Sequence, residues 1–125
     1  MEKIKNFREL TIWRKGIEIV KKTYKASKTF PRHEFYGLAS QMQRSAVSIP
    51  SNIAEGFNRF HNREYKHFLY IALGSCAELE TQVEIASELE YLDIPRKVVL
   101  LEDIDHESRM ITNLIKSVNR KGFLL

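Results

Sequence analysis

The chain has 125 residues, of which 43% are hydrophobic and 29% charged, a balance typical of one soluble globular domain. Its single cysteine, Cys76, excludes an internal disulfide, and no apolar run approaches the roughly 20 residues of a membrane span. Because the first residues, MEKIKNF, also lack an apolar signal core, we expect a cytoplasmic protein with one domain over residues 1–125.

Apolar residues recur every three or four positions along four segments, which predicts helices at about residues 6–28, 34–57, 62–91 and 95–120. Proline or short polar turns separate these segments. Short connections place consecutive helices antiparallel. The sequence therefore predicts an all-α, up-down-up-down four-helix bundle without strands.

The first helix is expected to face the core with one apolar seam, formed by Leu10, Trp13, Ile17, Val20 and Tyr24. Ile12 and Ile19 fall behind this seam, and Ile71 and Ile85 fall off the main seam of the third helix. Repeated apolar positions behind a core predict a second buried surface, so these four isoleucines are candidate contacts between subunits. A broad core-facing stripe is the alternative.

The second helix carries two stripes around an internal proline, Pro50. The apolar stripe comprises Leu38, Met42, Ala46, Ile49, Ile53 and Phe57. The polar stripe comprises Gln41, Ser45, Ser48, Asn52 and Glu55. Because Pro50 frees a backbone carbonyl, the polar side chains are expected to satisfy and cap the helix, and a ligand-binding face is the alternative.

Several segments together resemble one known family. They are the run QMQRSAVSIPSNIAEG (41–56), the connection FPRHEFYGL (30–38), which matches the pattern FPxxExYGL, and the opening Phe7, Leu10 and Trp13. A third-helix set also matches: Tyr65, Phe68, Leu69, Ala72, Ser75, Glu78 and Leu79. The chain thus resembles the bacterial four-helix bundle family of 23S ribosomal RNA intervening-sequence proteins, related to the accessory variability protein of diversity-generating retroelements.

The resemblance implies a four-helix fold, a ring-shaped homopentamer and a link to nucleic acid. It supplies no catalytic residue, because the family has no known active site. A polar set of the signature, which we expect to be structural, comprises Gln41, Arg44, Asn52 and Glu55.

Charge is distributed unevenly along the chain. Residues 1–33 hold ten basic and three acidic side chains, whereas residues 62–94 hold two basic and seven acidic ones. Cations that share a surface bind phosphates. The basic residues of the first helix are therefore candidate contacts to nucleic acid: Arg14, Lys15, Lys21, Lys22, Lys25 and Lys28. The alternatives are a solvated face, or pairing with the acidic third helix (Glu80, Glu84, Glu88).

A cluster of aromatic and basic residues spans Phe57 to Tyr65 and includes Arg59, Phe60 and Arg63. Such a cluster could stack and clamp unpaired bases, but completion of the bundle core by Phe57 and Tyr65 is the favoured interpretation. Contact with nucleic acid is expected to be to backbone and shape, without sequence specificity.

Catalysis is not expected. Two Glu/Asp-x-x-His pairs, Glu64 with His67 and Asp103 with His106, have the spacing of di-iron ligands, but the neighbouring apolar seams would point inward in their place. No metal, cofactor, small-molecule substrate or membrane is predicted. The sequence favours a non-catalytic homo-oligomer that binds nucleic acid, RNA above all, and the alternative is a protein–protein interaction scaffold.

Overall fold

The computed structural model of the chain describes residues 4–121, with side chains as far as Val118. Its elements are two short 3-10 helices, η1 (Phe7–Glu9) and η2 (Arg32–Glu34), and four α-helices: α1 (Thr11–Ser27), α2 (Leu38–Phe57), α3 (Asn62–Glu88) and α4 (Ile94–Lys121). The prediction of an all-α chain is confirmed, since the described residues form no strand. None of the described helices is long and apolar enough to cross a membrane.

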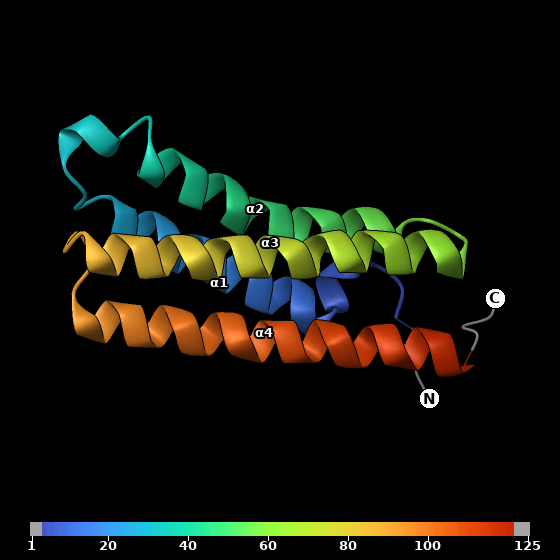
Figure 1. The fold of residues 1–125 in the computed structure, drawn as a ribbon. Coiled ribbons are helices and arrows are strands. Elements are labelled where there is room, and N and C mark those ends of the chain that lie inside the picture. The colour runs from blue at the N-terminus through green and yellow to red at the C-terminus, as the bar shows by residue number, and fades with distance from the viewer. Residues whose placement is uncertain (1–3, 122–125) are drawn as a thin grey trace.

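The four helices lie side by side (Figure 1). Along the described chain, α1 packs on α2 and α4, and α3 packs on the same two helices, so α1 and α3 are diagonal to one another. The α1–α2 and α3–α4 connections lie at one end of the molecule, and the α2–α3 connection lies at the other (Figure 1). The end of α1 and the start of α4 therefore share one end, which we call the α1–α2 end.

The core is built mainly from the apolar stripes of α2, α3 and α4, and α1 contributes Ile12, Ile19 and Ala26. Met42, Ala46, Ile49 and Ile53 of α2 are inaccessible to solvent. The predicted seam of α3 is buried throughout: Tyr65, Leu69, Ala72, Cys76, Leu79, Val83 and Ala86. The predicted core-facing stripes of these two helices are therefore confirmed.

The predicted core seam of α1 is wrong in part. Leu10, Trp13 and Val20 of that seam pack against the core and are partly buried, but the fully buried side of this helix is a different one. Its buried residues are Ile12, Gly16, Ile19, Thr23, Ala26 and Ser27. Tyr24 of the predicted seam is 43% exposed. The cause is the close approach of α2: a Cβ atom on Gly16 would lie 3.2 Å from Pro50 Cβ, so small side chains face the kinked helix.

Candidate nucleic-acid interface

The outer side of α1, together with its C-cap residue, carries four exposed basic residues, Arg14, Lys21, Lys25 and Lys28, which we call the basic face. They recur at steps of seven, four and three residues, so an α-helix places them on one side. Arg14 donates from Nη1 to the carbonyl of Arg8, at 3.1 Å. Within the described part of the chain, none of the three lysines makes an ion pair. Their charges are available to a ligand.

The other two candidate lysines form ion pairs with acidic residues of the same chain. Lys15 Nζ lies 2.8 Å from Asp103 Oδ1 and 2.9 Å from Glu18 Oε1, and Lys22 Nζ lies 2.6 Å from Asp103 Oδ2. Although burial alone would raise it, hydrogen bonds from both lysines hold the pKa of Asp103 below its usual value. The same contacts raise the pKa of Lys15. Lys15 and Lys22 thus join α1 to α4, and their positive charges are balanced there.

The alternative that α1 pairs with the acidic residues of α3 is wrong. These two helices are diagonal in the bundle, and the acidic partner of α1 is Asp103 of α4. Glu84 of α3 instead accepts a contact from Lys97 of α4, at 3.2 Å. Sequence reasoning could not identify Asp103, because the pairing depends on which helices are neighbours.

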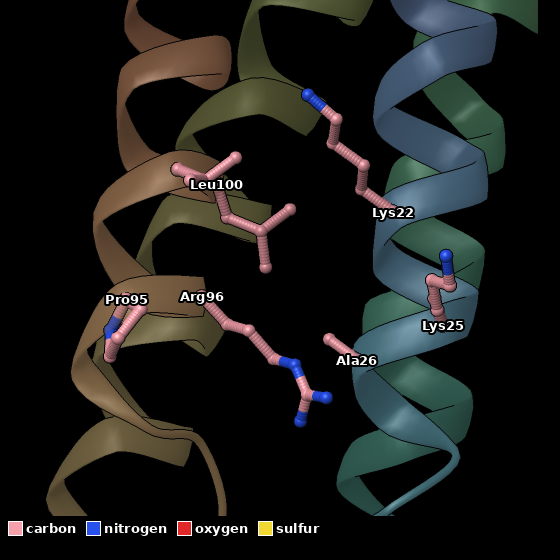
Figure 2. Close-up of a pocket in the computed structure, with 7 residues that line it drawn as sticks. Lys22, Lys25, Ala26, Pro95, Arg96 and Leu100 are labelled. Carbon is pink, nitrogen blue, oxygen red and sulfur yellow. The ribbon is translucent and has the colours of Figure 1, made fainter.

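A groove of about 280 Å³ lies between α1 and α4 at the α1–α2 end (Figure 2). Its lining is Lys22, Lys25, Ala26, Pro95, Arg96, Val99 and Leu100. The side chain of Arg96 extends from α4 toward α1, and Lys25 stands on the opposite wall (Figure 2). The Arg96 guanidinium makes a long ion pair, with Nη1 3.6 Å from Asp93 Oδ2. The groove therefore extends the basic face onto α4, with a residue that sequence analysis missed.

The connection between α1 and α2 presents two adjacent aromatic side chains to solvent. Phe35 is 62% exposed and Tyr36 is 90% exposed, and their ring centroids lie 4.9 Å apart in an edge-on arrangement. Lys28, Arg32 and Phe35 line the same hollow of about 130 Å³. The aromatic pair is therefore next to the basic face. The feature of the sequence that could have identified this pair is the Phe35-Tyr36 dipeptide, because it lies in a connecting segment outside the apolar stripes of the core.

The segment that carries these rings is fixed on both sides. Glu34 accepts a hydrogen bond from the Leu38 backbone N–H at 3.0 Å, and Tyr91 donates its hydroxyl to the other carboxylate oxygen at 3.0 Å. The hydrogen bond from Leu38 and then that from Tyr91 lower the pKa of Glu34. A Cβ added at Gly37 would lie 2.6 Å from Glu34 Oε1, so a larger residue there would displace the carboxylate that accepts the hydrogen bond from Leu38. Phe30 is buried at the start of the segment, and its ring centroid lies 5.5 Å from that of Tyr91.

The aromatic and basic cluster after α2 is largely structural. Tyr65 is buried, Phe57 is half-buried, and their rings meet edge-on with centroids 6.1 Å apart. Burial raises the pKa of Tyr65 to about 12. Arg59 is paired with Glu55 at 2.7 Å. Only Phe60, at 92% exposed, presents its ring to solvent among the three aromatic residues of this cluster.

The polar set of α2 divides into two groups. Asn52 donates from Nδ2 to the Ser48 carbonyl and to its hydroxyl, at 2.8 and 2.9 Å, and the Ser48 hydroxyl lies 2.7 Å from that of Ser75 on α3. Asn52, Ser48 and Ser75 thus join α2 to α3, which is the structural role expected of Asn52. Gln41, Arg44 and Glu55 are exposed, and the first two line a polar hollow of about 310 Å³ between α2 and α3.

The four candidate subunit contacts also divide. Ile12 and Ile19 are 5% and 0% exposed and belong to the core of the single chain, so their assignment to a second surface is wrong. The reason is the rotated core side of α1. Ile71 and Ile85 of α3 are 38% and 43% exposed, on the outside of the bundle.

Potential reactive groups are few within the described residues. They contain no cluster of three or more His, Cys, Asp or Glu side chains that could hold a metal ion. Cys76 is buried, and burial is the main reason that its pKa is raised to about 12. Such a thiol carries little thiolate at neutral pH.

The fold has a counterpart among solved structures. A protein of unknown function from the S23 ribosomal protein family of Bacteroides thetaiotaomicron VPI-5482 is similar, with a TM-score of 0.79 and 21% identity. The similarity covers 85% of this chain and 99% of that one. Among proteins with curated descriptions, none matches the chain.

The sequence pattern of one family, described as 23S rRNA-intervening sequence protein, matches residues 8–113. The match spans α1, α2, α3 and most of α4, and so includes the basic face, the aromatic pair and the α2 signature. The chain therefore belongs to the family of 23S rRNA-intervening sequence proteins.

Proposed function

We propose that the protein is a non-catalytic nucleic-acid-binding module, with RNA as the favoured ligand and the basic face of α1 as the contact surface. The observation that supports this most is the exposure of Lys21, Lys25 and Lys28 on one side of a helix without an internal ion pair. Cations arranged in this way bind phosphates and release counterions. A role as a ribonucleoprotein or retroelement-type accessory protein agrees with this proposal.

The acidic third helix does not neutralise this face. Neighbouring helix axes in a bundle are roughly 8–10 Å apart, so diagonal helices are separated by more than the Debye length of about 8 Å at physiological salt. Because α1 and α3 are diagonal, the acidic residues of α3 act on a ligand at α1 only weakly. A polyanion therefore meets mainly the positive charge of α1 and Arg96.

The experiment is a fluorescence-anisotropy titration of structured RNA and duplex DNA at several salt concentrations. The test variant changes Lys21, Lys25 and Lys28 to Glu. We expect micromolar or tighter binding by the unmodified protein, and loss of binding by the variant at moderate salt. The slope of log K against log salt should fall by about 2 to 3, because each lost phosphate contact removes roughly 0.7–0.9.

A matched control reverses three exposed basic residues outside the basic face, Arg63 in the first turn of α3 and Arg109 and Lys116 on α4. This control makes the same change in net charge and should bind more tightly than the α1 variant. Equal binding by both variants would show that only net charge matters. Absence of binding by the unmodified protein would leave the second candidate, a scaffold whose basic face docks an acidic protein.

The assembled form is the second part of the proposal. We propose that the antiparallel up-down-up-down bundle is the repeating unit of a ring-shaped homo-oligomer, with a pentamer favoured. The exposed isoleucines of α3, Ile71 and Ile85, support a contact between copies, because apolar side chains repeated on an outer face favour association. A ring would repeat the basic face in every subunit and so increase avidity for a long polyanion.

A further inference from the structure

We propose that the α1–α2 connection is a stacking platform for unpaired nucleotides, formed by Phe35 and Tyr36 beside Lys28 and Arg32. This inference rests on the proposed nucleic-acid function and names the class of ligand: single-stranded rather than duplex nucleic acid. We call these four residues the aromatic platform.

The first argument is the absence of a folding role for Tyr36. Its side chain is 90% exposed, and its hydroxyl has no hydrogen-bond partner within the described residues. The neighbouring residues of the segment have structural roles: Phe30 and Leu38 are buried, Glu34 binds the start of α2, and Gly37 makes room for Glu34. A large exposed aromatic residue in an otherwise structural segment indicates binding.

The second argument is preorganisation. Glu34 accepts hydrogen bonds from the Leu38 N–H and the Tyr91 hydroxyl, so it attaches the segment to α2 and to the α3–α4 connection. Glu34 precedes the exposed residues Phe35 and Tyr36 directly in the sequence. The connection projects at the α1–α2 end of the bundle (Figure 1). Rings on a fixed backbone lose little conformational entropy when a base stacks on them.

The third argument is charge. Lys28 and Arg32 line one hollow with Phe35, and Lys21 and Lys25 continue the positive surface along α1. Proteins that bind single strands combine aromatic faces for the bases with cations that follow the phosphates. In a duplex the base faces are stacked on one another, so a duplex offers the platform its phosphates but no free ring face. The arrangement therefore favours unpaired nucleotides.

The test compares two RNA probes, a fluorescein-labelled oligoadenylate of about 16 nucleotides and a duplex RNA of the same length, titrated against the full chain. Tyr36→Ala should weaken oligoadenylate binding about tenfold, and Phe35→Ala should weaken it by a similar factor. Duplex binding should change less than about twofold, because phosphate contacts remain. Tyr36→Phe, which keeps the ring, should bind oligoadenylate as the unmodified protein does.

Phe60 provides the matched control. It is 92% exposed, flanked by Arg59 and Arg63, and lies near the opposite end of the bundle. Phe60→Ala removes an equally exposed ring and should leave oligoadenylate binding unchanged. Weakening by Phe60→Ala with none by Tyr36→Ala would overturn the proposal in favour of the later cluster.

Three further outcomes separate this inference from the proposed function. If Tyr36→Ala and Phe35→Ala bind oligoadenylate normally while the α1 charge reversal does not, the platform is wrong and nucleic-acid binding stands. If the unmodified protein binds neither RNA, the proposed function fails and the platform fails with it. If Tyr36→Ala changes the mass measured by light scattering but not RNA binding, the rings form a protein contact, and the platform is again wrong.

Discussion

Glu107 is the least compatible residue of the core. It is fully buried on α4, and neither carboxylate oxygen has a hydrogen-bond partner within the described residues. A Cβ on Gly16 of α1 would lie 3.3 Å from Oε2. Burial raises the pKa of Glu107 to about 8, against the opposing charge of Lys15. The carboxyl in turn raises the pKa of Cys76 on α3, after the larger effect of burial.

This environment predicts a dependence of stability on pH. The folded pKa of about 8 exceeds the ordinary value of 4.5, so the folded protein keeps a proton that the unfolded chain releases between these pH values. Stability contributed by this group is therefore lost as pH rises from about 4.5 to about 8. Glu107→Gln cannot ionise, and it should be more stable than the unmodified protein at pH 7, by about 1–3 kcal/mol.

Urea unfolding at pH 5 and pH 8 checks this prediction. The gain in free energy of unfolding of Glu107→Gln over the unmodified protein should be larger at pH 8, because only the unmodified protein is destabilised there by the ionisation of a buried carboxyl. Glu102→Gln, at an exposed position of the same helix, serves as the control and should show no such gain. An equal pH dependence in Glu107→Gln and the unmodified protein would contradict the assignment.

At the scale of the helices, the spacing of apolar residues predicted the buried side wherever one stripe was clearly more apolar than the others. In α2 and α3 the longest unbroken run of apolar residues at helical spacing is the stripe that the structure buries, although Ile71 and Ile85 of α3 lie outside it. In α1 two stripes compete. The predicted stripe has the larger side chains but lies at the margin of the core, where Trp13 is partly buried and Tyr24 is exposed. Gly16 and Thr23 face the core because α2 approaches α1 closely at Pro50. This constraint depends on the packing of two helices, so the sequence of α1 alone does not reveal it.

In the candidate site too, features of a single helix could be predicted from the sequence, and features that depend on neighbouring helices could not. The exposed lysines of α1 followed from helical spacing alone, since a helix fixes which residues share a side. The ion pairs of Lys15 and Lys22 with Asp103 could not be predicted in this way, because Asp103 lies far along the chain on another helix. Arg96 joins the basic face for the same reason, through the α1–α4 groove. The exposure of Tyr36 depends on how Glu34 fixes the connection.

Two helical glycines give a prediction about helix packing. A Cβ on Gly56 of α2 would lie 2.8 Å from Phe68 Cβ on α3, whereas a Cβ on Gly74 would meet nothing within 4 Å. Gly56→Ala should therefore lower the free energy of unfolding by about 1–3 kcal/mol, because the two helices must separate. Gly74→Ala should raise it by about 0.5–1 kcal/mol, since alanine restricts the unfolded chain and adds no clash.

Chemical denaturation of both variants, under conditions in which the protein is dilute, provides the measurement. Opposite signs of the change are the expected result. A stabilising Gly56→Ala would show that α2 and α3 are less tightly packed than the structure indicates.

For the whole molecule, the basic face and the candidate contact between copies lie on different helices. The basic face and its extension at Arg96 lie on α1 and α4, and the exposed isoleucines Ile71 and Ile85 lie on α3. Since α1 and α3 are diagonal, copies that associate through α3 leave α1 accessible. Association and nucleic-acid binding are therefore compatible in one assembly.

This separation predicts that assembly can be disrupted without loss of the nucleic-acid surface. Changing Ile71 and Ile85 to Lys places charges on the outer side of α3, where an apolar contact between copies would have to bury them. Light scattering should then give a mass near 14.7 kDa, in place of a multiple of that value for the unmodified protein. Val98→Lys on α4 is a single-charge control at a similarly exposed position, 44% against 43% for Ile85, and should retain the assembled mass. If the unmodified protein is already a monomer in dilute solution, the ring is wrong. If it is assembled and the double variant keeps the same mass, then Ile71 and Ile85 are not the contact, and another surface of the bundle must hold the copies together.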